Sequence, residues 1–125
     1  MDRSRFDSYI STYNSGDVAA LAEFYADDMI FENFGDRHEG ADVLAFMGQL
    51  HHVITDKFEP LTVVIEGDTI AMEANSVITA LQDLPDLPAG PMMKGTYNCR
   101  MFAFYKTDAD KILHARVAGW QPIPA

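Results

Sequence analysis

Apolar residues recur at helical spacing through the N-terminal part of the chain. Phe6, Tyr9, Ile10 and Tyr13 follow the i, i+3, i+4, i+7 pattern, which predicts a helix over Ser4–Tyr13. Gly16 can end this helix, and Asp17 can cap a second one whose inner face is formed by Val18, Leu21, Phe24 and Tyr25. A third helix is predicted from about Ala41 to Val53.

The remaining apolar runs have the period of strands. β-Branched and aromatic runs predict strands at Met29–Phe34, Leu61–Glu66, Thr69–Ala80, Lys94–Lys106 and Lys111–Trp120. Gly67-Asp68 forms a short turn, so the runs on either side of it should be antiparallel neighbours. Arg37–Gly40 is interpreted as a loop, and Gln82–Pro91, with three prolines and a glycine, as a long connection.

Three helices set apart from a mainly antiparallel sheet indicate an α+β domain. We expect the helices to pack on one face of a strongly curved sheet and to enclose a conical pocket. The 125 residues are one domain's worth, so a single domain over residues 1–125 is predicted.

Composition narrows the possible partners. The chain has 19 acidic and 9 basic residues, a net charge of −10, and therefore lacks the clustered cations that nucleic acids and anionic membranes require. Cys99 is the only cysteine, which excludes an intramolecular disulfide and favours the cytoplasm. The first residues resemble neither a signal nor a transit peptide, and no run is long enough to span a membrane.

Three segments carry a resemblance to a known family. Asn14–Asn33 (NSGDVAALAEFYADDMIFEN) closely resembles the opening of the nuclear-transport-factor-like superfamily. His38–Val43 resembles the entry into its third helix, and Lys111–Val117 its last strand. The superfamily includes ketosteroid isomerases, limonene epoxide hydrolases and SnoaL-like polyketide cyclases. Because the scaffold hosts enzymes, ligand binders and interaction domains, the resemblance specifies the fold better than the chemistry.

The resemblance implies that neither known catalytic set is complete. Tyr9 matches the oxyanion-donating tyrosine of the isomerases, but Asn33 stands where their aspartate base would be, and Arg100 where a protonated aspartate would donate. We therefore expect no steroid isomerase activity. Limonene epoxide hydrolases use an Arg-x-Asp pair, but this sequence has Glu73-Ala74-Asn75 at the corresponding position. The further catalytic aspartate of these hydrolases, on their last strand, corresponds to a position near Val117.

The superfamily's strand register implies which side chains would line the cone. Glu73, Tyr9 and Arg100 are the catalytic candidates. The ligand-binding candidates are Asn33, Asn75, Asn98, Phe31, Phe46, Phe102, Phe104 and His38. In the alternative interpretation, Glu73 and Arg100 form a structural ion pair, with Tyr9 and the asparagines as hydrogen-bond partners.

Metal and cofactor binding are not expected. His51 and His52 are adjacent on a predicted helix and cannot chelate as an i, i+4 pair would, and no cysteine or aspartate stands at ligand spacing. His38 is placed at the pocket mouth, where it could transfer protons or simply be a surface histidine.

Two functions of different class remain open. The first is an enzyme of lyase, isomerase, cyclase or hydrolase type that acts on an apolar cyclic or aromatic compound, with Glu73 as the acid/base. The second is a non-catalytic binding or interaction domain. The ligand is expected to carry a polar or anionic end that meets Arg100. A homodimer is expected through the sheet face away from the helices, which was assigned Ile70, Met72, Ile78, Met101 and Trp120.

Overall fold

The computed structural model describes residues 1–87, 90–119 and 123–124. The helical elements are α1 (Arg3–Ser15), the short 3₁₀ helix η1 (Ala19–Glu23) and α2 (Ala41–Leu50). The strands are β1 (Tyr25–Asn33), β2 (Asp36–Glu39), β3 (Ile54–Glu66), β4 (Thr69–Ala80), β5 (Gly95–Asp108), β6 (Lys111–Gly119) and β7 (Ile123–Pro124).

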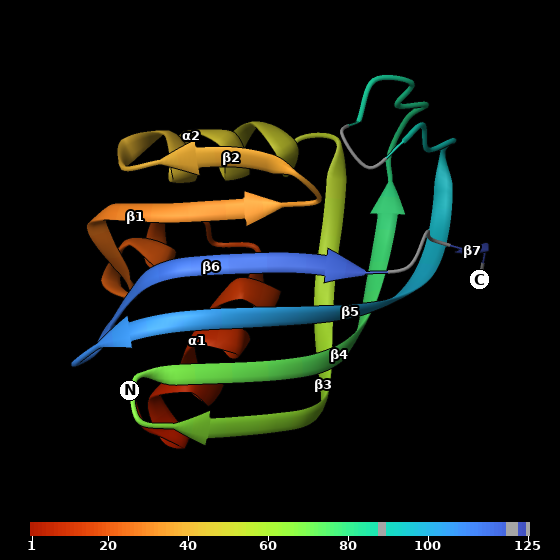
Figure 1. The fold of residues 1–125 in the computed structure, drawn as a ribbon. Coiled ribbons are helices and arrows are strands. Elements are labelled where there is room, and N and C mark those ends of the chain that lie inside the picture. The colour runs from red at the N-terminus through yellow and green to blue at the C-terminus, as the bar shows by residue number, and fades with distance from the viewer. Residues whose placement is uncertain (88–89, 120–122, 125) are drawn as a thin grey trace.

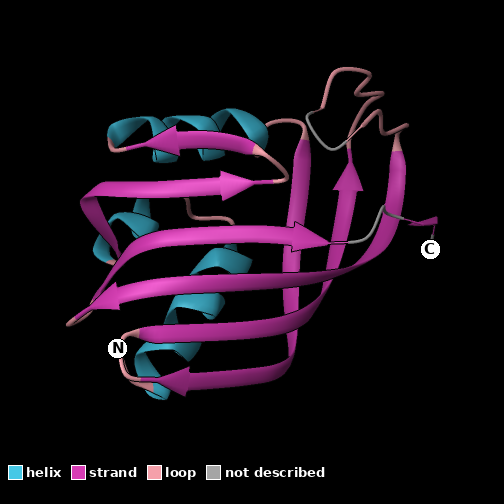
Figure 2. Cartoon of the chain, viewed as in Figure 1, coloured by secondary structure: helices cyan, strands magenta, loops and turns pink. Residues whose placement is uncertain are grey.

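The strands form one mixed sheet in the order β2-β1-β6-β5-β4-β3, and β7 pairs with β5 (Figure 1). The β1–β6 pairing is parallel, and every other pairing is antiparallel. The sheet bends around the helices, with α1 behind β3–β5 and α2 beside β2 (Figures 1 and 2). The predicted α+β class is therefore correct.

The helix prediction needs one main correction. Two α-helices are present in the described part of the chain, because the predicted second helix is only the five-residue η1 and β1 already begins at Tyr25. Most of the segment Arg37–Gly40, interpreted as a loop, belongs to strand β2 (Asp36–Glu39), which pairs with β1. Helix α2 ends at Leu50, three residues before its predicted end.

The first helix has the ends that its sequence specifies. The Asp2 side chain accepts a hydrogen bond from the backbone N–H of Arg5 at 2.8 Å, which satisfies a free amide of the first turn. Gly16 closes the helix in a left-handed conformation with φ +79°. The face between these ends buries Phe6, Tyr9 and Ile10, as predicted from their spacing.

Strand β3 begins earlier than predicted. The strand runs from Ile54 and not from Leu61, where the predicted strand begins. Pro60 is tolerated because β3 is at the edge of the sheet and its pairing with β4 shifts register between Pro60 and Thr62. This extension places Asp56 within a strand.

Asn14 fastens α1 to the edge of β3. Its side-chain amide donates to the carbonyl oxygen of Phe58 at 2.8 Å and accepts from the Phe58 N–H at 2.7 Å. We expect Asn14→Ala to lower the free energy of unfolding by about 1–2 kcal/mol, because two partly buried backbone groups lose their partners. Urea denaturation would measure this loss. Ser8→Ala, at an exposed site on the same helix, should change stability by less than about 0.5 kcal/mol, and an equal loss in both variants would contradict the assignment.

Alternation along β4 and β5 decides which side chains face the helices. Cys99, Met101, Ala103 and Tyr105 are buried against the helical layer, together with Ile70, Met72, Ala74 and Ser76 of β4. The sheet surface away from the helices, here called the outer face, carries Glu73, Asn75, Asn98, Arg100, Phe102 and Phe104. This assignment is the reverse of the prediction. A shift of one residue moves every side chain of a strand to the other face, so six candidates change sides together.

Candidate functional site

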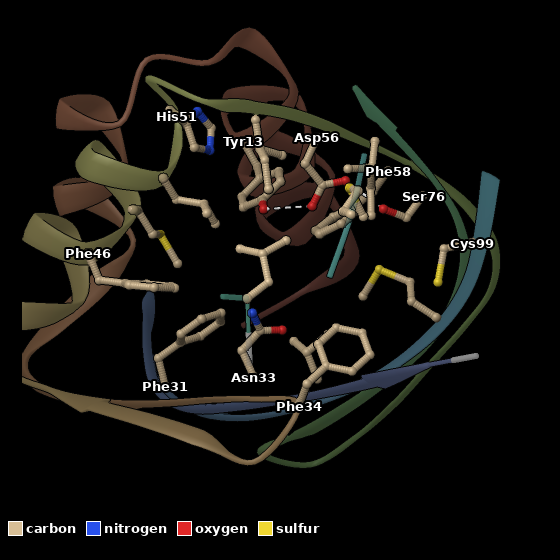
Figure 3. Close-up of a pocket in the computed structure, with 18 of the residues that line it drawn as sticks. Tyr13, Phe31, Asn33, Phe34, Phe46, His51, Asp56, Phe58, Ser76 and Cys99 are labelled. Carbon is tan, nitrogen blue, oxygen red and sulfur yellow. Dashed lines mark hydrogen bonds between the residues drawn. The ribbon is translucent and has the colours of Figure 1, made fainter. Parts of the chain in front are cut away.

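A cavity of about 140 Å³ lies between the helices and the inner face of the sheet. Its lining is mostly aromatic and aliphatic, and a few polar groups point inward (Figure 3). The lining residues are Tyr9, Tyr13, Phe31, Asn33, Phe34, Phe46, Met47, Leu50, His51, Ile54, Asp56, Phe58, Ser76, Ile78, Leu87, Met92, Cys99, Met101, Tyr105 and Val117. Leu87 and Met92 bring the connection between β4 and β5 to this cavity.

Asp56 on β3 is the most unusual group in the lining. One carboxylate oxygen accepts a hydrogen bond from the Ser76 hydroxyl at 2.5 Å, and the other accepts from the Tyr13 hydroxyl at 3.1 Å (Figure 3). Desolvation by burial raises the pKa of Asp56 to about 6, although the two hydrogen bonds lower it. A carboxyl group with this pKa can both accept and release a proton near neutral pH.

The neighbours of Asp56 are held in place by ring contacts. Tyr13 stacks on Phe58 with ring centroids 4.3 Å apart, and it makes a T-shaped contact with His51 with ring centroids 6.1 Å apart. The titratable groups that face Asp56 from α1, from the end of α2 and from β5 are Tyr9, Tyr13, His51, Cys99 and Tyr105. Burial lowers the pKa of His51 and raises the pKa of each of the other four.

At neutral pH these shifts leave the cavity with one charge. The imidazole, the phenols and the thiol are all uncharged, so Asp56 is the one charged side chain among the described lining residues. The lining contains no lysine or arginine among the residues that the structure describes.

A group of phenols lies deeper behind the cavity. The hydroxyl of Tyr9 is 3.0 Å from the hydroxyl of Tyr25, which in turn donates to the sulfur of Met47 at 3.7 Å. Burial and the neighbouring Tyr25 raise the pKa of Tyr9 well above its usual value. Because Tyr25 uses its one proton toward Met47, Tyr9 donates its own proton to Tyr25, and it does not act as a base at physiological pH.

The wall opposite Asp56 is aromatic, with one amide. Phe31, Phe34, Phe46 and Asn33 face the cavity across from Tyr13, Asp56 and Ser76 (Figure 3). Phe34 holds a left-handed backbone with φ +51°, which is uncommon for a residue other than glycine, and its N–H donates to the carbonyl oxygen of Val117 at 3.1 Å. This turn brings the Phe34 ring to the cavity.

The predicted site residues divide into two groups. Tyr9, Asn33, Phe31 and Phe46 line the cavity, as predicted. Glu73, Asn75, Asn98, Arg100, Phe102 and Phe104 lie on the outer face, so the prediction that they line the pocket is wrong. His38 does not line it either: its ring stacks on Phe46 at 3.9 Å, and its Nε2 lies 2.8 Å from an Asp36 carboxylate oxygen.

Arg100 takes part in a polar network on the outer face. Its guanidinium donates to Glu73 at 2.9 Å and to the side-chain oxygen of Asn75 at 3.0 Å, and Thr62 donates to the second Glu73 oxygen at 3.2 Å. The alternative prediction of a Glu73–Arg100 ion pair is confirmed, with Asn75 but not Tyr9 as a partner. The prediction that the ligand has an anionic end was based on Arg100. Because Arg100 does not line the cavity, nothing in the cavity supports that prediction.

The outer network is expected to contribute little to stability. The side chains of Arg100 and Glu73 are 34% and 31% exposed, and water screens such a pair. Arg100→Met and Glu73→Gln should each change the free energy of unfolding by less than about 1 kcal/mol, measured by urea denaturation. A loss of several kcal/mol in either variant would show that the pair is essential to the fold.

Sequence reasoning missed Asp56, Tyr13 and Ser76. The signal for Asp56 was its alternation with Ile54 and Phe58, which puts a carboxylate on the apolar face of a strand.

In the described ranges, no three histidine, cysteine, aspartate or glutamate side chains are grouped as metal ligands. The described helices include none that is both long and apolar enough to cross a membrane.

A curved mixed sheet that encloses an apolar cavity against its helices defines the nuclear-transport-factor-like superfamily of α+β proteins. Within it, the chain belongs to the SnoaL-like domain family, whose model matches residues 6–115. No protein of curated function matches the sequence significantly.

Solved structures with the same fold cover nearly the whole chain. A candidate polyketide cyclase from Pseudomonas putida KT2440 is 24% identical, with a TM-score of 0.79 over 91% of this chain and 87% of its own. A SnoaL-like polyketide cyclase from Agrobacterium tumefaciens C58 is 17% identical, with a TM-score of 0.75 over 94% and 89%. An epoxide hydrolase of M. tuberculosis, described as LEH-like, is 12% identical, with a TM-score of 0.75 over 93% and 80%. At these identities the likeness is one of fold.

Proposed function

We propose that this protein is a small-molecule enzyme in which Asp56 transfers a proton to or from an apolar cyclic or aromatic substrate held in the cavity. The observation that carries the proposal is the position of Asp56: a carboxyl group with a pKa near 6 faces an otherwise apolar cavity. The reaction would be of isomerase, cyclase, lyase or hydrolase type and would proceed without a metal. The names of the structural neighbours, which include cyclases and an epoxide hydrolase, support an enzyme of this kind.

Asp56 and three polar groups of the cavity have distinct roles in the proposed reaction. Asp56 accepts the proton in its carboxylate form and returns it in its acid form. Ser76 and Tyr13 fix the direction of the carboxylate, because each donates to a different oxygen. Asn33 lines the same cavity, and its uncharged amide can orient a carbonyl or hydroxyl group of the substrate. The predicted acid/base, Glu73, is replaced in this role by Asp56.

A screen with two matched variants tests this proposal. Cyclic ketones, epoxides and hydroxylated aromatic compounds would be incubated with the protein in D₂O, and mass spectrometry would detect product or deuterium uptake. Wild type and Glu73→Gln should react alike, whereas Asp56→Asn should not react. A reaction that persists in Asp56→Asn, or that is lost only in Glu73→Gln, would refute the assignment. If no compound reacts, the non-catalytic binding function is the better description.

We also propose that the protein forms a homodimer through the outer face of its sheet. The prediction that Ile70, Met72, Ile78 and Met101 form this face is wrong. Ile70, Met72 and Met101 are buried on the inner face of the sheet, and Ile78 lines the cavity. Trp120, which was predicted with them, lies outside the described residues. Phe102 and Phe104, which are 41% and 49% exposed, supply the apolar surface instead.

Sedimentation at micromolar concentration should give a species of twice the 13.9 kDa chain mass. Phe104→Asp should shift that species toward the monomer, because it places a charge in the apolar contact. A single monomeric species in the wild type would contradict the dimer.

A cytoplasmic location stays a prediction based on the lone cysteine.

A further inference from the structure

The negative charge of Asp56 has no cationic side chain beside it among the described residues that line the cavity. Asp56 is the one charged side chain in the described lining at neutral pH, and its two hydrogen-bond donors, Ser76 and Tyr13, are both neutral. A carboxylate can accept about four hydrogen bonds, and the structure gives Asp56 two side-chain donors, so it has the capacity to accept from a ligand as well. A desolvated carboxylate without a cation is costly, and a cation that enters the cavity would remove most of that cost.

The rest of the lining suits a cation as well. Phe58 and Tyr13 stand beside the carboxylate, and Phe31, Phe34 and Phe46 face it across the cavity (Figure 3). Aromatic faces attract cations through the electrostatic field of their quadrupoles. An anion would meet the opposite situation, because the cavity offers it no cationic partner and the whole chain carries a net charge of −10.

We infer that the cavity binds a protonated amine carried on an aromatic or alicyclic ring, with the ammonium group against Asp56 and the ring between Phe31, Phe34 and Phe46. A cavity of about 140 Å³ matches a single ring, since an engineered apolar cavity of ~150 Å³ in another protein binds benzene. The amide of Asn33, on the same wall as those rings, can bond a polar substituent at the far end.

This inference deepens the proposed function and rests on it in one respect, namely that Asp56 is the working group of the cavity. An ammonium substrate would bring its own proton to the site. Transfer of that proton breaks an N–H bond, forms an O–H bond on Asp56, and leaves a neutral amine beside a neutral carboxylic acid. No further reactant is needed for this step.

Three probes of one size test the charge preference. Benzylamine, benzyl alcohol and benzoate would be titrated into the full-length chain at pH 7.5 by calorimetry, and amide NMR shifts of Asn33 and Phe46 would locate the binding. Benzylamine should bind at least ~10-fold more tightly than benzyl alcohol, and benzoate most weakly. In Asp56→Asn the advantage of the amine should fall to ~2-fold or less.

Glu73→Gln is the matched control, because it removes one negative charge from the outer face and leaves the cavity intact. It should keep the wild-type preference for the amine over the alcohol, which separates cavity binding from attraction to an acidic surface.

A second measurement needs no variant. In the wild type, the preference for the amine should decline as the pH falls below about 6 and Asp56 becomes protonated, while the affinity for the alcohol stays constant.

Equal binding of amine and alcohol, an amine preference that survives in Asp56→Asn, or no saturable amine binding would each overturn the inference. The outcome is distinguishable from failure of the proposed function, because binding is measured without turnover. An amine preference in a protein whose reaction ignores Asp56 would leave the inference standing and remove the proposed catalytic role. A reaction that depends on Asp56 in a protein without an amine preference would remove only the inference about the amine and keep the proposed catalytic role.

Discussion

Replacement of Asp56 by asparagine is expected to lower substrate turnover by about 10²–10⁴-fold, the usual range for loss of a general acid or base. Asparagine keeps the size of the side chain; its one carbonyl oxygen can accept from one of the two hydroxyls, of Ser76 or Tyr13, and its NH₂ group can donate to the other. It cannot take up a proton near neutral pH. The loss should therefore lie in the rate of the chemical step and not in the shape of the cavity.

The pH profile separates this role from a purely structural one. If Asp56 acts as a base, activity in the wild type should rise with pH through about 6, where its carboxyl loses its proton. The residual activity of Asp56→Asn should lack that step. Glu73→Gln should keep both the wild-type rate within about threefold and the same profile, since Glu73 lies outside the cavity. Wild-type activity in Asp56→Asn would refute the assignment.

The second large effect concerns stability. The pKa of Asp56 is about 6 in the folded protein against 3.8 in an unfolded chain, so the folded state binds more protons between these two values. Its contribution to stability is fully present below pH 3.8 and is lost as the pH rises through about 6. The difference corresponds to about 2–3 kcal/mol.

Urea denaturation of wild type and Asp56→Asn between pH 4 and pH 8 measures this contribution. Relative to the wild type, the variant should gain about 2–3 kcal/mol of unfolding free energy across that range, because asparagine does not titrate. Comparison of the two proteins cancels the titration of the other carboxyl groups. A constant difference, or a change of opposite sign, would show that Asp56 is not held in a desolvated site.

The fold class could be predicted from the sequence because helical and strand periods are local signals. Phe6, Tyr9 and Ile10 occupy the buried face of α1 as their spacing requires, and the turn at Gly67-Asp68 joins two antiparallel strands. The short elements η1 and β2 were misassigned because each depends on tertiary contacts. β2, for example, is a strand only through its pairing with β1.

The site was harder to predict because it depends on which face of each strand points inward. The register implied by the resemblance points the face of β5 with Phe102 and Phe104 into the pocket, although the same face also carries Asn98 and Arg100. The adjacent strand resolves the ambiguity. In β4 the set that contains Ile70, Met72 and Ala74 is apolar except for Ser76, whereas Glu73 and Asn75 lie on the alternate set, so the more polar set had to face outward.

Asp56 was missed for a related reason. The predicted strand begins at Leu61, so the alternation of Ile54, Asp56 and Phe58 falls outside it. An edge strand with a bulge accommodates Pro60, and only the pairing of β3 with β4 reveals both features. The partners of the carboxylate, Tyr13 and Ser76, come from α1 and β4, and their meeting cannot be deduced from local sequence.

The most direct test of the central claim is a titration of the Asp56 side-chain carboxyl carbon by ¹³C NMR, assigned by comparison with Asp56→Asn. A resonance that titrates near pH 6 in the wild type, and that is absent in the variant, is the predicted result. A normal aspartate titration below about pH 4.5 would contradict the claim, because a carboxyl group with that pKa is not desolvated and cannot exchange protons with a substrate near neutral pH.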